Sequence, residues 1–325
     1  MSPGLFRAAR LALLAQACTL AGAFQQSASG PIDVIPRAAP KPKTAPAPIL
    51  RVDSSLVLIP VRVTTPDGAS VTDLKKEDFE LFQDGVRQTI TEFSKDDAPV
   101  SAGVLLDISG SMRNKMRKAS EAASEFFKFA NPDDEFFLVE FNARARLSIP
   151  FTRDWAGIAE KIASAKASGM TALLDAVHLA VGQMKQARYN RKALVIVSDG
   201  GDNFSRRNLR ELKETLIEAG VQVYSLGVFD GNYSVKHTPE ERRGPGLLDQ
   251  VALDTGGCTY PVSVDALPQI GERIARELRS QYVLGYSPAA LTTDGKYHRV
   301  NLRLASPAEN RLRTYYRQGY YAPAQ

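Results

Sequence analysis

Between residues 100 and 281 the chain alternates short apolar runs with amphipathic segments, and this alternation constrains the fold more than any other feature. Apolar runs that end in polar loops, separated by segments with a period near 3.6 residues, are typical of βαβ units. The pattern predicts a doubly wound α/β domain whose mostly parallel sheet has helices on both faces. The expected strands lie near 102–106, 135–141, 193–198, 221–228 and 258–262, with a short edge strand near 146–150.

Segments with a two-residue period flank this domain on both sides. In the N-terminal β segment, 51–99, apolar residues alternate from Val57 to Val63, and the Asp84-Gly85 pair predicts a hairpin before a strand at Thr89–Phe93. In the C-terminal β segment, 282–325, we expect strands near 300–304 and 311–321. Each segment alone would leave unpaired strand edges. We therefore expect the two to pair in one small β sandwich.

The N-terminal residues have the features of an export signal. Arg7 and Arg10 precede an apolar segment that ends at Ala21-Gly22-Ala23, which predicts a signal peptide over 1–23 and a mature chain that begins near Phe24. Residues 24–50 are rich in proline and alanine and predict an extended linker. No other apolar run is long enough to cross a bilayer. We expect an exported protein, whether periplasmic, secreted or at the cell surface, with no transmembrane segment after cleavage.

Charge and cysteine content limit the function classes. The 325 residues carry a formal charge of +5, and removal of the two signal arginines leaves +3. This mild basicity and the expected export argue against a nucleic-acid partner. The charged runs 113–118 and 206–213 are expected to be solvated faces of helices. Without Cys18 of the signal, Cys258 has no partner in the chain, and we expect a buried free thiol, with an intermolecular bridge as the alternative.

Oxygen-bearing side chains follow two of the predicted strands. Asp107, Ser109 and Ser111 come directly after the first strand, and Asp199 ends the most apolar one. Thr171 opens a helix between them. Ligands bind at the carboxyl ends of strands in open α/β sheets. Two carboxylates and three hydroxyls, without His or Cys, suit Mg²⁺, Mn²⁺ or Ca²⁺ rather than zinc or copper, and of these three we expect Mg²⁺.

Two other interpretations of these residues remain. Serines before a helix often cap it, but capping does not explain two aspartates at two strand ends. A serine nucleophile needs a base within reach. The segment containing Ser109 is not a G-x-S-x-G elbow, and no sequence pattern gathers the histidines. The histidines are His178, His237 and His298.

Together, D-x-S-x-S, the threonine of GMTAL and the aspartate of VSDGGD resemble the metal-ion-dependent adhesion site of the von Willebrand factor type A domain. The stretches 73–93 and 282–325 also look like the flanks of an acidobacterial form of this domain. The resemblance covers 100–280. It implies that the metal positions are Asp107, Ser109, Ser111, Thr171 and Asp199.

The resemblance implies a function as a binding module rather than as an enzyme. An exported protein of this kind would hold a divalent cation and use it to bind an acidic residue of a partner protein, as an adhesion or scaffold module does. The alternative is a metal-dependent or serine hydrolase that uses the same residues. Asp107 and Asp199 would then be committed to the metal, and no general base converges on the site. Metal-dependent turnover of generic ester, phosphate or peptide substrates would favour the hydrolase.

Overall fold

A six-stranded sheet forms the centre of the structure, a computed structural model that describes residues 56–95, 97–228, 239–288, 294–305 and 311–323. The predicted signal peptide and the linker lie outside these residues. The strand order is β10-β9-β8-β5-β6-β7, and only β7 runs antiparallel to its neighbour. The strands are β5 (Val100–Asp107), β6 (Glu135–Phe141), β7 (Ala145–Thr152), β8 (Arg191–Ser198), β9 (Val221–Val228) and β10 (Cys258–Val262).

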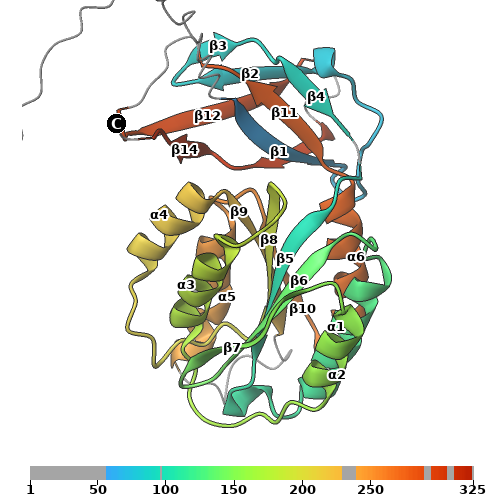
Figure 1. Cartoon of the computed structure of the whole chain (residues 1–325), viewed down its shortest axis with the longest axis vertical. Coiled ribbons are helices and arrows are strands. Elements are labelled where there is room, and N and C mark those ends of the chain that lie inside the picture. The colour runs from blue at the N-terminus through green and yellow to red at the C-terminus, as the bar shows by residue number, and fades with distance from the viewer. Residues whose placement is uncertain (1–55, 96, 229–238, 289–293, 306–310, 324–325) are drawn as a thin grey trace, which may run out of the picture. The chain divides into compact units, whose positions relative to one another are not determined.

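Helices cover both faces of this sheet, as the alternation predicts (Figure 1). One face packs against α1, α2 and α6, and the other against α3, α4 and α5. The doubly wound α/β prediction is confirmed, with the short strand at the edge as expected. The helices are α1 (Met116–Lys128), α2 (Trp155–Ala163), α3 (Leu173–Met184), α4 (Leu209–Ala219), α5 (Pro239–Ala252) and α6 (Leu267–Arg279).

Burial on both faces explains why the central strands are mostly apolar. All eight residues of β5 are buried, and Leu105 contributes to one core while Leu106 contributes to the other. The helices approach each other closely: a Cβ at Gly271 of α6 would lie 2.1 Å from the carbonyl oxygen of Ala122 in α1. A larger residue at Gly271 would therefore force α1 and α6 apart.

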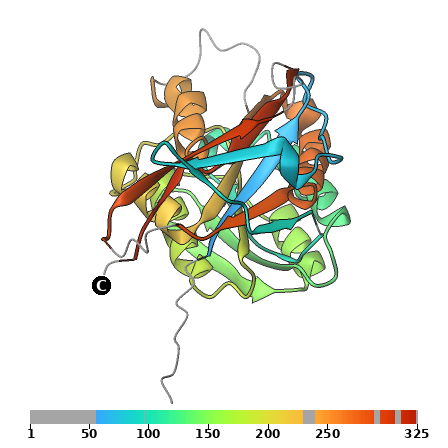
Figure 2. The same ribbon diagram turned by 90° about the horizontal axis from the view of Figure 1, so that it is seen from above.

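The flanking β segments form a two-sheet sandwich, which confirms the prediction that they pair. Strand β1 (Val57–Thr64) lies between β11 (Tyr282–Tyr286) and β13 (Arg313–Tyr316), in the sheet β13-β1-β11-β4. The second sheet has the order β14-β12-β2-β3, in which β12 (Tyr297–Leu304) pairs with β2 (Phe79–Gln83). Figure 2 shows the blue N-terminal strands interleaved with the red C-terminal ones.

Two strand boundaries differ from the sequence prediction. The hairpin turn at Asp84-Gly85 forms, with φ of 49° and 84°, but its second strand is β3 (Val86–Gln88). The chain then crosses to the other sheet to form β4 (Glu92–Ser94). The expected strand 311–321 is likewise divided into β13 and β14 (Gly319–Tyr321), one in each sheet. Alternation of side chains does not reveal where a strand changes sheets. The predicted strand at Thr89–Phe93 therefore missed β3 and overlapped only part of β4, whereas the prediction for 311–321 merged β13 and β14.

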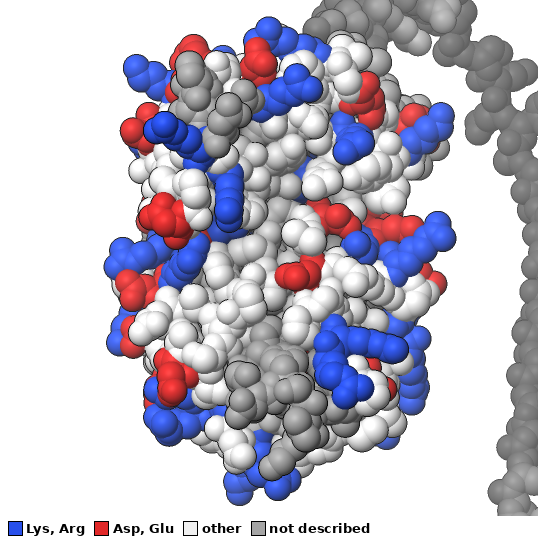
Figure 3. All heavy atoms as spheres, turned by 180° about the vertical axis from the view of Figure 1, so that it is seen from behind, with Lys and Arg blue, Asp and Glu red and all other residues white. Residues whose placement is uncertain are grey.

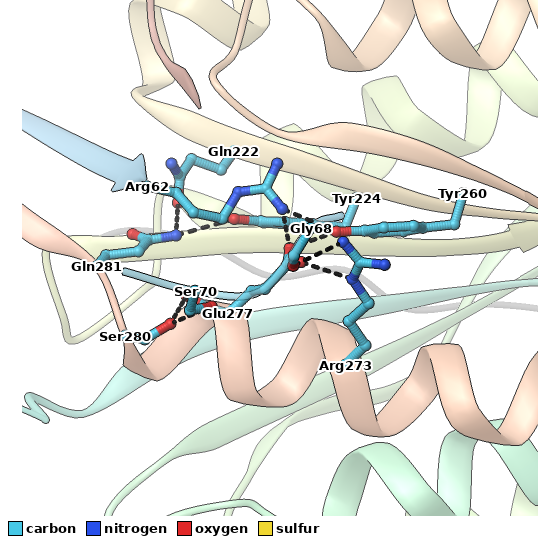
Figure 4. Close-up of polar contacts among 10 residues, drawn as sticks. All are labelled: Arg62, Gly68, Ser70, Gln222, Tyr224, Tyr260, Arg273, Glu277, Ser280 and Gln281. Carbon is cyan, nitrogen blue, oxygen red and sulfur yellow. Dashed lines mark hydrogen bonds and ion pairs between the residues drawn. The ribbon is translucent and has the colours of Figure 1, made fainter. Parts of the chain in front are cut away.

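A buried polar cluster joins the sandwich to the α/β domain (Figure 4). The Arg62 guanidinium of β1 forms an ion pair with Glu277 of α6, and each side chain is 2% exposed. Arg62 also donates to the Tyr260 hydroxyl at 2.8 Å. Arg273 Nε donates to the second carboxylate oxygen of Glu277 at 2.9 Å. The cluster therefore links two segments more than 200 residues apart in sequence.

Three surface properties bear on function. No helix in the described part of the chain is long and apolar enough to cross a membrane. Cys258 is half-buried, more exposed than expected, and forms no disulfide within the described residues. Lysines and arginines are interspersed with acidic residues over the upper part of the face in Figure 3, while basic side chains predominate at its lower end.

Candidate metal site

The candidate site lies where the winding of the sheet reverses direction. From β5 the chain crosses to β6 on one side, and later returns to β8 on the other side of β5. In open α/β sheets, ligands bind at such a switch point, and we refer to the carboxyl ends of the two central strands as the crevice. Asp107 is the last residue of β5, and Asp199 follows the last residue of β8. The structure therefore brings both predicted carboxylates to this crevice.

Asp107 is completely buried and has a partner at each carboxylate oxygen. Its Oδ1 accepts the backbone N–H of Ser109 at 2.8 Å, and its Oδ2 accepts the Ser198 hydroxyl at 2.6 Å. Burial, followed by the nearby charge of Asp199, raises the pKa of Asp107 to about 7. Close to neutral pH this carboxyl group is therefore divided between its two protonation states, and a nearby cation would favour the charged one.

Ser198 was not predicted as part of the site. The parallel register pairs Leu106 with Val197, so that Asp107 and Ser198 are neighbours on adjacent strands. The Ser198 hydroxyl also accepts the N–H of Gly200 at 2.9 Å. Ser198 therefore fixes the orientation of Asp107 and the start of the loop that carries Asp199. The position of a serine at the end of an apolar strand was its only signal in the sequence.

Lys115 contradicts the prediction that the whole charged run 113–118 is a solvated helix face. It is only 5% exposed, and its ammonium group donates to Asp199 Oδ2 at 3.2 Å and to the Val228 carbonyl at 3.3 Å. Its neighbours Arg113 and Arg117 are exposed, as expected. Lys115 precedes α1 and points into the crevice, because the two acceptors lie on β9 and after β8.

The serines and the threonine lie on loops that are hydrogen-bonded to each other. The hydroxyl oxygens of Ser109 and Ser111 are 3.1 Å apart. The N–H of Gly110 donates to the Gly169 carbonyl at 2.9 Å, which brings the segment before Thr171 against the serine loop. Thr171 is 4% exposed, and its N–H donates to Asn203 Oδ1 at 2.9 Å. Asn203 is the second positioning residue that the sequence prediction missed.

A glycine pair holds the Asp199 loop against α5. Gly200 has φ of 77°, in the region that favours glycine, and a Cβ there would lie 2.4 Å from the Gly244 carbonyl oxygen. Side chains at either position would displace the loop. The close contact therefore keeps Asp199 at the crevice.

The donor set fits a hard divalent cation. Two carboxylates and three hydroxyls provide only oxygen ligands, and waters or a partner's carboxylate would complete such a shell. In the described part of the chain, no three His, Cys, Asp or Glu side chains group closely enough to hold a metal ion. A site here would therefore depend on its hydroxyls as well as on Asp107 and Asp199. The Lys115 ammonium is the one contrary feature, because it lies beside Asp199 and would repel a cation.

Two nearby aspartates have structural roles instead. Asp175 Oδ1 accepts the N–H groups of Arg206 and Arg207, and Asp202 Oδ1 accepts the N–H of Ser205. Burial raises the pKa of Asp202. Both carboxylates fold the loop after Asp199.

The described residues provide no histidine contact to Ser109 or Ser111. Of the histidines considered in the sequence, His178 lies on α3 and His298 on β12, whereas His237 is outside the described residues. No histidine therefore lies beside these hydroxyls as the base of a Ser-His pair in the part of the chain that is described.

Comparison with protein families gives a match over part of the chain. Residues 104–201 match the family model described as von Willebrand factor type A domain, which supports such a domain over this span. No protein with a curated description matches the chain.

Solved structures that resemble the chain have low sequence identity to it. A von Willebrand factor type A protein from Catenulispora acidiphila is 14% identical over 78% of this chain and 75% of its own, with a TM-score of 0.49. An aerotolerance-related membrane protein from Bacteroides fragilis is 20% identical over 55% of this chain and 98% of its own, with a TM-score of 0.46. The von Willebrand factor domain of a type V pilus tip protein from Porphyromonas gingivalis is 12% identical over 55% of this chain and 95% of its own, with a TM-score of 0.45.

Proposed function

We propose that this protein is an exported binding module that holds a divalent cation, Mg²⁺ in preference to Mn²⁺ or Ca²⁺, and uses it to bind an acidic residue of a partner protein. The observation that carries the proposal is the placement of two buried carboxylates, Asp107 and Asp199, at the switch point of the sheet. The hydroxyl groups of Ser109 and Ser111 lie on the same loop as Asp107. The match to the type A domain over 104–201 supports the same conclusion.

In this proposal the five predicted residues have two roles, according to whether they are charged. Asp107 and Asp199 would neutralise the cation, and Ser109, Ser111 and Thr171 would provide neutral oxygens directly or through water. When bound, the cation supplies an open coordination position for a carboxylate of the partner. Ser198 orients Asp107, while Lys115 competes for Asp199. The sheet is stabilised by its own apolar cores, so loss of the cation should leave the fold intact.

Isothermal titration calorimetry with Mn²⁺ tests the metal site. We expect Asp107→Asn or Asp199→Asn to weaken Mn²⁺ binding by several kcal/mol, because one formal charge opposite the dication is lost even at an effective dielectric constant of about 20. Ser111→Ala should cost less, since water can replace a hydroxyl. Asp202→Asn is the matched control, because it removes a carboxylate from the same loop outside the site. Equal Mn²⁺ affinities in all four variants and the wild type would refute the assignment.

Capture from an envelope extract tests the binding function. We expect the wild-type protein to retain a partner in Mg²⁺ and to release it in EDTA, and the Asp107→Asn variant to retain none. Circular dichroism of the same samples should show an unchanged fold. Metal-dependent turnover of a panel of ester, phosphate and peptide substrates, lost in Asp107→Asn, would instead support the hydrolase.

A further inference from the structure

The loops around the candidate metal site carry a large excess of exposed basic side chains. The loops belong together because hydrogen bonds join them: Gly110 to Gly169, Ala172 to Asn142, and Phe204 to Thr171. The exposed basic residues on these loops and on the start of α5 are Arg113, Arg144, Lys166, Arg206, Arg207, Arg242 and Arg243. We call this set the basic rim.

Acidic side chains do not balance the basic rim. Apart from the two buried carboxylates of the site, the described acidic side chains on these segments are Asp175, Asp202 and Glu240, all partly buried. Asp175 and Asp202 already accept backbone N–H groups. Within the described residues, the surface around the crevice therefore carries more exposed basic than acidic side chains, which favours a positive potential there.

A hollow beside Thr171 gives part of the basic rim a defined shape. It has a volume of about 550 Å³, and its lining includes Arg144, Arg206, Phe204, Leu179 and Asp175. Within the described residues, neither arginine forms an ion pair with a carboxylate. Phe204 and Met170 are each 47% exposed and lie next to Thr171, so the hollow has exposed apolar surface beside its arginines.

We propose that the partner binds through an acidic segment that carries several carboxylates and an apolar side chain, rather than through one isolated acidic residue. One carboxylate would occupy the metal position, a second would lie on Arg144 and Arg206, and the apolar side chain would cover Phe204. This inference rests on the proposed function for the first carboxylate only. Arginine suits the second position, because its planar fork binds a carboxylate through two hydrogen bonds.

Fluorescence anisotropy with labelled peptides in Mn²⁺ tests this proposal on the full chain. The probe is a short peptide with several glutamates and one phenylalanine, and its control has all but one glutamate changed to glutamine. We expect the polyacidic probe to bind at least tenfold more tightly. The difference should shrink when the salt concentration rises from about 0.01 to 0.15 M, because screening shortens from about 30 to 8 Å.

A pair of double variants locates the contact. Arg144→Gln with Arg206→Gln should reduce the affinity for the polyacidic probe about tenfold and leave the single-glutamate control unchanged. Arg299→Gln with Arg313→Gln, two exposed arginines of the sandwich, is the matched control and should change neither. Equal affinities for the two peptides, or equal losses in the two double variants, would overturn the inference.

Two further measurements separate this proposal from the metal site. Calorimetry should give the same Mn²⁺ affinity for Arg144→Gln with Arg206→Gln as for the wild type. Normal Mn²⁺ binding with no preference for the polyacidic probe would refute the basic-rim contact alone, whereas loss of all Mn²⁺ binding would refute the proposed function. A single-stranded oligonucleotide that binds as tightly as the polyacidic probe, without Mn²⁺, would show a general polyanion surface and overturn the proposal.

Discussion

Removal of the Glu277 carboxylate should destabilise the protein more than any comparable change outside the cores. Arg62 and Glu277 are each 2% exposed, and Arg62 Nε is buried without a hydrogen-bond acceptor among the described residues. In Glu277→Gln, Arg62 would keep the Tyr260 hydroxyl and the ring of Tyr315, 4.0 Å away, but would lose its carboxylate. Breaking one partner of a buried ion pair costs about 3–5 kcal/mol.

The reverse change should cost less. In Arg62→Met, Glu277 would still accept hydrogen bonds from Arg273 and Tyr260, so its charge would remain partly compensated. The double variant Arg62→Met with Glu277→Leu removes both charges, and replacing a buried pair with apolar residues is often close to neutral. We therefore expect a coupling free energy of about 1–3 kcal/mol between the two positions.

Urea denaturation followed by circular dichroism measures these free energies of unfolding. Arg276→Met with Glu272→Leu is the matched control, since this pair lies on the solvent side of the same helix and should change stability by less than about 1 kcal/mol. The reasoning would be refuted if Glu277→Gln cost no more than the control. It would also be refuted if the double variant lost the sum of both single losses.

Two further predictions concern charged groups elsewhere. A hydrogen bond to Asp84 is the main cause of the raised pKa of His298, so the stability it contributes should be complete below the usual His pKa of 6.5 and lost as pH rises through the higher folded value. In urea titrations, His298→Gln should therefore lose up to about 1 kcal/mol of unfolding free energy at pH 5.5 and little at pH 9. A loss that does not depend on pH would contradict this. Lys115→Met should raise the Mn²⁺ affinity measured by calorimetry, because the ammonium beside Asp199 repels a dication; a lower affinity would mean that Lys115 chiefly orients Asp199.

The periodic features of the sequence predicted the fold, because burial imposes a period. The fully buried strand β5 and the alternating strand β12 were both recognised for this reason. The changes of sheet after Gln88 and after Tyr316 were missed, since a strand that crosses from one sheet to the other keeps its alternation. The pairing of the two terminal segments was predicted from their unpaired edges alone.

Sequence reasoning predicted those residues of the candidate site that lie at the carboxyl ends of strands. Asp107 and Asp199 come together because parallel strands place their carboxyl ends at one edge, which sequence reasoning can anticipate. Ser198 and Lys115 could not be assigned in this way. Ser198 lies beside Asp107 because of the register between β5 and β8. Lys115 belongs to a run of charged residues, and its ammonium group alone in that run contacts Asp199 in the described structure.

The parallel sheet separates stability from binding. The candidate site lies at the carboxyl ends of its strands, whereas Arg62 of the buried cluster lies over the ring of Tyr224, close to the amino end of β9. The free-energy cost of burying two carboxylates at the crevice is reduced in two ways. The pKa of Asp107 is raised to about 7, which favours its neutral form, and Asp199 forms an ion pair with Lys115. Under the proposed function, a bound cation would therefore not be needed to hold the sheet together, unlike the ion of a small domain that folds only around its metal. We expect binding at this end to follow metal occupancy without unfolding the chain.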